Sequence, residues 1–497
     1  MTLTQLPALQ VILPLIAAPV CLLLRSGRLA WLLSILVSTT ALIIAVLLLR
    51  LVLENGTVIY SYGGWAAPWG IEYRVDIANA FVLAIVAGIS TVVLLFSRVG
   101  VSYEIKSSDQ SLFYTAYLLC LTGLLGMTAT GDAFNLFVFL EISSLSSYVL
   151  IAMGPDRRGL TAAYQYLIMG TIGATFILIA VGLLYMVTGT LNMADLANRL
   201  PALAQSRTLR VAFAFLTVGI GLKLALFPLH LWLPNAYAYA PHVVSAFLAA
   251  TATKVAVYVL LRFMYGVFGS SFTFDSMPLQ FILMVLGALA VLSGSTIAVF
   301  QHNIKRMLGY SSVAQIGYMI LGLSLASVSG LTATLVHLLN HALMKGGLFL
   351  AVACMAYQLG GVRLAGHDVL HLLDVAVIGG KDRQITGPQS LDQPARHRIE
   401  PFQMPAVAGN IAPVPEIRVE FDEIGEGQAA RFGLSAQVDQ LFGQIGVGFA
   451  LPQMRDAAMA EDIAYLPDAV GDAPRRRRDA RRRRRLPGQV RRPGGTG

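Results

Sequence analysis

The chain has 497 residues, of which 56% are hydrophobic and 13% are charged, against about 45–50% and about 25% in typical soluble domains. Its mean hydropathy of +0.67 excludes a soluble multi-domain enzyme for most of the length. The charge is uneven, because residues 1–365 contain 28 Lys, Arg, Asp and Glu residues and the remaining 132 residues contain 35. We therefore divide the chain into a membrane domain, 1–365, and a polar, Arg-rich tail, 366–497.

Apolar segments follow one another along the first part, and each is long enough to cross a hydrocarbon core of roughly 30 Å as a helix. Lipid favours helices, because backbone polar groups must pair within their own segment. The segments are apolar on all faces, which excludes alternating barrel strands. The predicted spans, about eleven in all, are 6–24, 29–53, 76–97, 111–130, 132–153, 161–187, 210–230, 243–266, 279–299, 305–326 and 328–357. We expect an all-α, polytopic membrane helix bundle.

The distribution of Lys and Arg among the loops predicts the orientation, since cytoplasmic loops are enriched in both. Loops after odd-numbered spans carry nine of these residues and loops after even-numbered spans carry six. We therefore expect the N-terminus outside and the residues after 365 in the cytoplasm.

The seventh span is irregular. Pro228 lies inside it, and a proline removes an amide donor and breaks or kinks a helix. Pro234 and Pro241 follow in a neutral, aromatic connection. Broken helices near mid-membrane are recurrent in ion transporters, although an ordinary proline kink gives the same pattern.

Ionisable residues lie near the middle of several spans, where each costs at least about 2.5–3.5 kcal/mol and is a functional hypothesis by default. The set consists of Glu141, Lys223, Lys254, His337, His341 and Lys345. The last three are spaced i, i+4 and i+8, on one helix face. Three lysines and one glutamate cannot neutralise one another pairwise. The set therefore favours a proton relay over a single structural ion pair.

Other interpretations of these residues remain open. Two histidines four apart could hold a metal or haem iron, but Lys345 on the same face would place positive charge beside the ion. Asp132 begins its span, where it could simply cap a helix. His230 and His242 lie near the predicted break and could extend the relay or only line the membrane interface.

Motifs for other chemistry are missing from the sequence. We find no phosphate loop, dinucleotide fingerprint, cysteine cluster or nucleophile elbow. We therefore expect no cofactor, no bound metal and no stand-alone enzymatic activity. The net charge of +9 comes from basic loops and an Arg-rich run, so we expect no nucleic-acid partner.

Four stretches, in order, resemble one family. They are Gly131–Glu141 (GDAFNLFVFLE), Gly221–Pro234 (GLKLALFPLHLWLP), Lys254 and His337–Lys345 (HLLNHALMK). This pattern resembles the antiporter-like membrane subunits, which include the large subunits of multi-subunit Na⁺/H⁺ (Mrp-type) antiporters and the proton-pumping subunits of respiratory complex I. The residues of the first stretch are most similar to the D subunit of Mrp antiporters.

The resemblance implies a fold of about fourteen helices, with two inverted five-helix repeats that each contain one broken helix. It implies that Glu141 modulates the charge of Lys223, the pumping lysine of the first half-channel. It also implies that Lys254 passes protons toward the centre. The stretch from His337 through His341 to Lys345 then belongs to the central relay and the second half-channel.

The resemblance covers roughly residues 5–365 and then stops. The family continues with about three more helices, including a second broken helix, whereas the sequence after Arg363 contains no apolar span. We expect a truncated second repeat. The tail is interpreted either as a frameshift near residue 365, which we favour, or as a natural, disordered and basic extension.

The function expected from the residues and the resemblance is that of a proton-translocating subunit of a monovalent cation/proton antiporter. The alternatives are a membrane subunit of a complex I-like NADH:quinone oxidoreductase or related hydrogenase, and a haem-binding electron carrier. Expected partners are other membrane subunits, protons with Na⁺ or K⁺, and the lipid bilayer of the inner (plasma) membrane.

Overall fold

A computed structural model describes residues 5–359 of the chain. The predicted polar tail, both interpretations of its origin, and the predicted truncation of the second repeat lie outside these residues. The prediction of a domain boundary near residue 365 therefore stays a prediction.

Helices account for most of the described residues, which confirms the predicted all-α fold class. The first group of helices is α1 (Leu6–Leu23), α2 (Gly27–Asn55), α3 (Ile77–Glu104), α4 (Gln110–Ala129), α5 (Ala133–Ala152), α6 (Arg158–Thr188) and α7 (Met193–Arg199). The second group is α8 (Arg207–Leu224), α9 (Trp232–Tyr239), α10 (His242–Leu261), α11 (Leu279–Val299), α12 (Ile304–Ser324) and α13 (Val328–Leu359). Each predicted apolar span overlaps one of these helices, and the seventh span runs past the end of α8. Within residues 5–359, nine helices are long and apolar enough to cross a membrane.

Polar residues mark where several helices begin. Asp76 forms a capping box with Asn79 at the start of α3, and Asn303 caps α12. Such side chains accept hydrogen bonds from the first amides of a helix, which have no partner within it. Long apolar runs are thereby cut into separate spans at defined positions.

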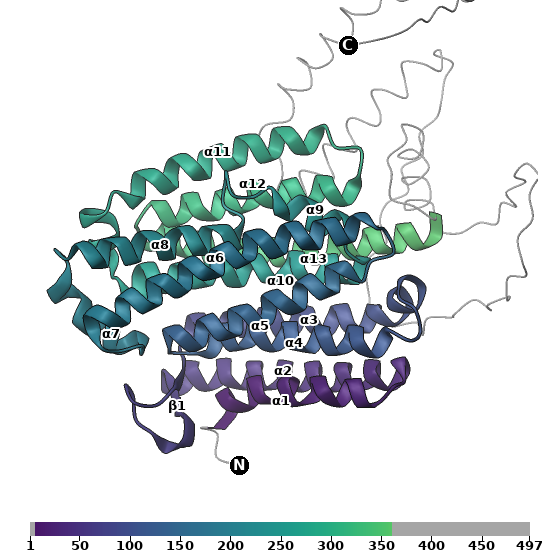
Figure 1. Cartoon of the computed structure of the whole chain (residues 1–497), viewed down its shortest axis with the longest axis horizontal. Coiled ribbons are helices and arrows are strands. Elements are labelled where there is room, and N and C mark those ends of the chain that lie inside the picture. Colours follow the sequence, from purple (N-terminus) through teal and green to yellow (C-terminus); the bar gives the residue numbers. More distant parts are fainter. Residues whose placement is uncertain (1–4, 360–497) are drawn as a thin grey trace, which may run out of the picture. The chain divides into compact units, whose positions relative to one another are not determined.

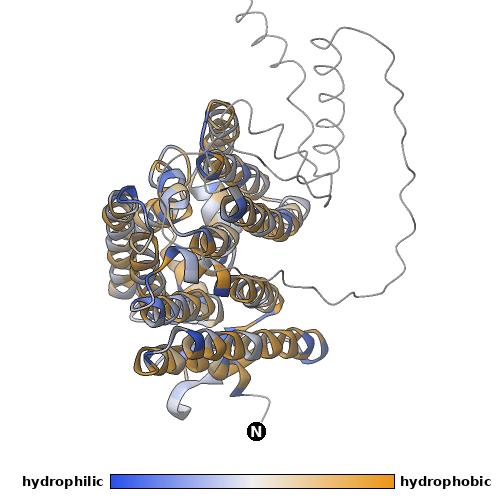
Figure 2. Ribbon diagram, turned by 90° about the vertical axis from the view of Figure 1, so that its right-hand side faces the viewer, coloured by the Kyte–Doolittle hydropathy of each residue, from blue (hydrophilic) through white to orange (hydrophobic). Residues whose placement is uncertain are grey.

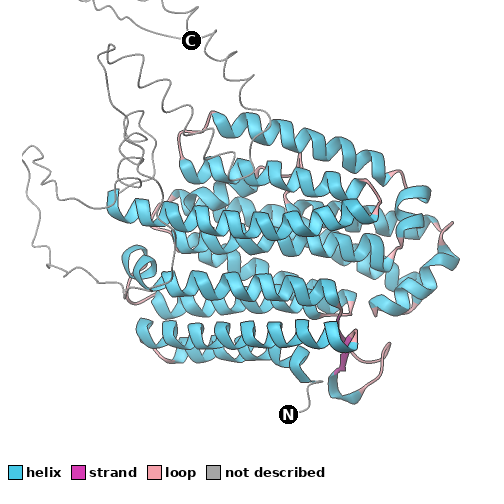
Figure 3. Cartoon of the chain, turned by 180° about the vertical axis from the view of Figure 1, so that it is seen from behind, coloured by secondary structure: helices cyan, strands magenta, loops and turns pink. Residues whose placement is uncertain are grey.

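The bundle is layered. Helices α1 and α2 pack against α3 and α4 on one flank, whereas α11 and α12 pack together on the other (Figures 1 and 3). Helices α4 and α10 are the most enclosed. Seen end-on, apolar residues also cover the outer faces of the helices (Figure 2), as expected where lipid replaces water. The buried lysines and His341 described below are enclosed by protein atoms.

Short elements between the spans were not predicted from the sequence. Strands β1 (Val58–Ser61) and β2 (Glu72–Val75) form an antiparallel hairpin at one end of the bundle. At the same end, Arg262 follows α10 in a π-helical turn, and its Nη1 lies 2.6 Å from Asp76 Oδ2. This ion pair ties the end of α10 to the start of α3.

The seventh span is broken, as predicted, but the break precedes the proline. Helix α8 ends at Leu224, Ala225 adopts a left-handed conformation with φ of 59°, and α9 begins at Trp232. A proline ring clashes with the carbonyl four residues earlier, and for Pro228 that residue is Leu224. The predicted span 210–230 is therefore wrong in extent, because the α-helix cannot continue beyond the residue with which the ring would clash.

Candidate functional site

Lys223 lies in the last turn of α8, directly before the break. The carbonyls at the end of a helix have no partner within it, and the Trp232 Nε1–H donates a 3.0 Å hydrogen bond to the Leu222 carbonyl. The Trp232 ring also stacks on Tyr166, with centroids 3.8 Å apart. The broken segment is thus fixed by α6 and α9, and Lys223 is held in one place.

Close backbone packing brings α6 against α8 next to this lysine. A Cβ atom on Gly219 would lie 2.7 Å from the Gly173 carbonyl oxygen, which is nearer than a side chain can approach. Small residues at such positions let helices pack closely in membranes. The glycine pair therefore sets how near Lys223 comes to α5 and α6.

Glu141 and Ser144, both on α5, receive the Lys223 ammonium group. Lys223 Nζ donates a 2.7 Å hydrogen bond to Ser144 Oγ and lies 3.4 Å from Glu141 Oε1. The side chain of Lys223 is 6% exposed and that of Glu141 is 25% exposed. The two predicted residues are brought together as an ion pair, and the serine contact was not predicted.

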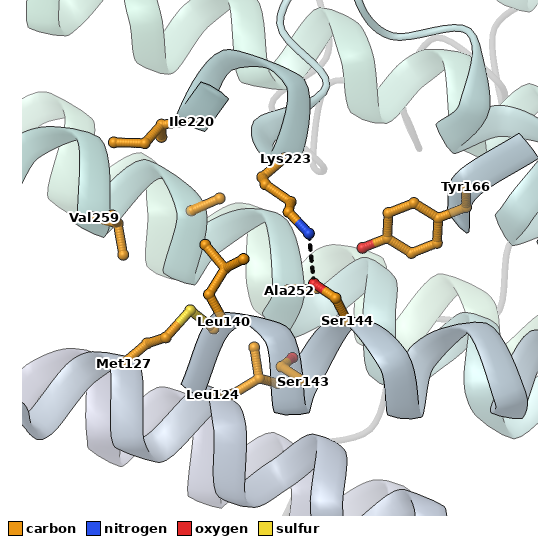
Figure 4. A pocket seen from close by; sticks show the side chains of 11 residues that line it. Leu124, Met127, Leu140, Ser143, Ser144, Tyr166, Ile220, Lys223, Ala252 and Val259 are labelled. Atoms are coloured by element: carbon orange, nitrogen blue, oxygen red, sulfur yellow. Dashed lines mark hydrogen bonds between the residues drawn. The ribbon is translucent and has the colours of Figure 1, made fainter. Parts of the chain in front are cut away.

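A cavity of about 30 Å³ adjoins Lys223, with Ser144 and Tyr166 on its wall (Figure 4). Leu124, Met127 and Leu140 make much of the remaining wall apolar. The volume suffices for about one water molecule. A proton carried by Lys223 therefore has both a hydroxyl and a water-sized space within reach.

Lys254 lies at the middle of α10 and is completely buried. Its Nζ donates hydrogen bonds to the Ala249 carbonyl and, at 3.5 Å, to Thr253 Oγ1. No acidic side chain pairs with it among residues 5–359. Carbonyl and hydroxyl oxygens thus satisfy this ammonium group without neutralising it.

The predicted triad lies on α13, which packs directly against α10. Lys345 is completely buried, and its Nζ donates to the Leu308 carbonyl at 2.9 Å and to Ser311 Oγ at 3.0 Å. The rings of His337 and His341 stack with centroids 6.2 Å apart. His341 is within electrostatic reach of both Lys254 and Lys345. The four groups therefore form one polar cluster inside the bundle.

Both ring nitrogens of His341 are buried without a hydrogen-bond partner in the described part of the chain. Buried polar atoms in proteins are nearly always hydrogen-bonded, often to ordered water. The imidazole therefore has free positions at which a proton can arrive or leave. Within the described residues, no cluster of three or more His, Cys, Asp or Glu side chains could hold a metal.

The three accessory residues do not join this cluster. Asp132 caps α5, because its Oδ1 accepts the Asn135 N–H at 2.7 Å. Burial raises the pKa of the Asp132 carboxyl, and the charge of Glu72 adds to the shift. His230 is buried in the break and stacks on Phe227. His242 begins α10 at the other end of the bundle and pairs with Glu104.

Comparison with known proteins identifies relatives of this chain. A family model described as "NADH:quinone oxidoreductase/Mrp antiporter, TM" matches residues 130–365. The N subunit of the NADH-quinone oxidoreductase of Desulforudis audaxviator is 44% identical over 372 residues, 73% of this chain and 72% of that protein. The D subunit of the Na⁺/H⁺ antiporter of Alkalihalophilus pseudofirmus is 32% identical over 299 residues, 60% of this chain and 59% of that protein.

A solved structure of the Mrp complex from Dietzia sp. DQ12-45-1b contains a chain of similar fold. The TM-score is 0.67 at 28% sequence identity, over 73% of this chain and 67% of that one. The residues that the family model matches include the broken helix and the buried charges described above. The chain belongs to the family of antiporter-like, proton-translocating membrane subunits that NADH:quinone oxidoreductases and Mrp antiporters share.

Proposed function

We propose that this chain is the proton-translocating subunit of a multi-subunit monovalent cation/proton antiporter. Protons pass from the Glu141–Lys223 pair through Lys254 to the cluster of His337, His341 and Lys345. The observation that carries the proposal is the placement of a buried lysine at a helix break, 3.4 Å from a single carboxylate.

The chemistry follows from the cost of burying charge. Lys223 is 6% exposed, and an uncompensated ammonium at membrane depth costs at least about 2.5–3.5 kcal/mol. While Glu141 stays charged and near, that cost is offset by attraction. When the carboxylate is neutralised or moves away, Lys223 relieves the cost by releasing its proton. A small change at Glu141 can therefore load or unload the lysine.

The released proton needs an acceptor. Among residues 5–359, no carboxylate pairs with the neighbouring lysines Lys254 and Lys345 to hold them charged. Lys254 and Lys345 are bound by carbonyl and hydroxyl oxygens, and such oxygens accept hydrogen bonds from an ammonium group without removing its charge. Two fully charged lysines near one another repel. If Lys254, His341 and Lys345 share a single proton, only one of them is charged at a time and this repulsion is removed. A transfer of that proton between them leaves the net charge of the cluster unchanged.

A second candidate is supported by the 44% identity with the N subunit of an NADH-quinone oxidoreductase. In that case the same relay works in a redox-driven pump, and partner subunits carry the redox cofactors. The antiporter is put first because the stretch from Gly131 to Glu141 most resembles the D subunits of Mrp antiporters.

The test is to isolate the native assembly that contains this chain and to place it in sealed vesicles. If the antiporter proposal holds, added Na⁺ or K⁺ drives proton movement without an electron donor. If proton movement instead requires a quinone and an electron donor, the second candidate replaces the antiporter proposal.

The orientation and the plasma-membrane location are part of the proposal. Single-cysteine labelling at Lys106, expected to react from the cytoplasm, tests both.

A further inference from the structure

Glu104, the last residue of α3, makes a two-point contact with the first residue of α10. Its Oε1 lies 2.6 Å from Nδ1 of His242, and its Oε2 accepts the backbone N–H of His242 at 2.8 Å. The Glu104 side chain is 7% exposed. A carboxylate at a helix start is favoured by the free amides and by the helix dipole. The contact therefore fixes both the ring and the backbone where α10 begins.

Lys305 contacts the same turn from another helix, α12. It lies in the first turn of α12, is 2% exposed, and its Nζ donates a 2.5 Å hydrogen bond to the Ala240 carbonyl. Lys305 is also within electrostatic reach of Glu104. Ala240 directly follows α9, the second segment of the broken helix. Side chains from two other helices thus hold the turn from α9 to α10 by hydrogen bonds.

The surrounding packing is tight. A Cβ atom on Gly100 would lie 3.0 Å from Val243 Cγ2, so α3 and α10 touch closely one turn away. Nε2 of His242 is buried without a hydrogen-bond partner among residues 5–359. A change in the charge of this imidazole therefore acts on Glu104 directly.

We propose that Glu104, His242 and Lys305 form a pH-responsive clamp on the turn between α9 and α10. Histidine changes charge between about pH 5 and pH 8. When His242 is protonated, the 2.6 Å contact with Glu104 is a full ion pair and the clamp is tight. When His242 is neutral, the ion pair is lost, Glu104 keeps only hydrogen bonds and its attraction to Lys305, and the turn opens more often.

Other charged or titratable groups surround the turn. On α3 and the loop that follows, Tyr103 contacts Tyr357 of α13, and Lys106 is exposed. At the start of α6, the Arg158 guanidinium lies over the Tyr239 ring and pairs with Asp156. Arg306 follows Lys305.

The clamp comprises positioning residues for transport. The clamp holds the turn at the end of α9. It therefore sets the angle of α9 against α8, and with it the position of Lys223. This consequence depends on the proposed function. The pH-dependent opening of the turn is a property of the chain alone, so it can be measured separately.

The first experiment follows backbone hydrogen exchange at His242 and Ser245 in the full chain in detergent, corrected for the intrinsic pH dependence of exchange. Replacing an ion pair by neutral hydrogen bonds predicts about tenfold more opening at pH 8 than at pH 5. In His242→Asn the amide still donates to Glu104 but does not titrate, so the pH dependence disappears. Glu104→Gln, which keeps an acceptor of the same size, also removes it.

His302→Asn and Lys106→Met are the matched controls, because both residues are exposed on loops at the same end of the bundle. Both are expected to keep the tenfold change. The proposal is overturned if exchange in the native chain does not vary with pH, or if His242→Asn varies as the native chain does.

The second experiment compares pH profiles of transport in the native assembly and in His242→Asn. A flatter pH profile of transport is expected in His242→Asn. If exchange responds to pH but the transport profile does not change, the clamp exists but does not position the transport path. If neither assembly transports protons at all, the proposed function fails while the exchange result stands.

Discussion

The two groups of buried charge in this bundle are satisfied in different ways. Lys223 has a carboxylate 3.4 Å away and a serine hydroxyl at 2.7 Å. Lys254 and Lys345 are more deeply buried, yet their partners within residues 5–359 are carbonyl and hydroxyl oxygens. An ion pair can be switched by neutralising one member, whereas an ammonium group held by neutral oxygens can only pass its proton on. The first group is thus suited to control and the second to relay.

The largest expected loss of transport comes from replacing Lys223. Lys223→Ala removes the group that carries the proton, and loss of a positioned proton-transfer group typically costs 100-fold or more in rate, about 10²–10⁴. Transport in the intact assembly is expected to fall to background while assembly persists. Lys106→Ala, at an exposed loop lysine, is the control and should transport normally. Near-normal transport by a correctly assembled Lys223→Ala complex would contradict the account.

Removing the lysine is expected to change the thermal stability in opposite directions in the two groups. Lys223→Met leaves the half-buried Glu141 without its counter-charge, and leaving a polar group unpaired in the interior costs at most about 1–3 kcal/mol. Lys254→Met instead removes a buried charge that has no acidic partner in the described chain, which is neutral or stabilising. Thermal unfolding in detergent should therefore show a lower midpoint for the first variant and an equal or higher one for the second. Equal losses in both would mean that the ion pair has no special role.

Ser144 provides a smaller effect within the first group. Ser144→Ala removes a 2.7 Å hydrogen bond to Lys223 but leaves the carboxylate in place. A single hydrogen bond is worth about 0.5–1.5 kcal/mol, so transport should fall by roughly 2–10-fold. Ser146→Ala is a suitable control, because that hydroxyl donates only to the Ile142 carbonyl of its own helix. A loss as large as that of Lys223→Ala would make the serine part of the proton path.

Much of this site could be predicted from the sequence, because Glu141, Lys223 and Lys254 are conspicuous inside apolar runs. Pro228 likewise predicted the broken helix. The position of the break could not be read directly, since the ring of Pro228 acts on the carbonyl of Leu224 rather than on its own position.

Residues at the ends of helices were harder to interpret. Glu104 and Lys305 have the sequence context of ordinary loop charges, and only the fold shows that both are buried against one turn. Nothing in the sequence singled out Ser144, because serines are common in these helices and burying a hydroxyl there costs little free energy. Contacts across the break, such as that of Trp232 with Leu222, depend on how the chain returns on itself.

The central claim is that Glu141 controls the proton on Lys223 across 3.4 Å. The most direct test is the pH profile of transport in Glu141→Gln, measured beside the native assembly. Without the carboxylate, no acidic side chain among residues 5–359 pairs with Lys223, so the lysine releases its proton at lower pH. The account predicts reduced transport with an optimum displaced to lower pH. An unchanged pH profile would show that the two residues do not interact in the working assembly, and the account would be wrong.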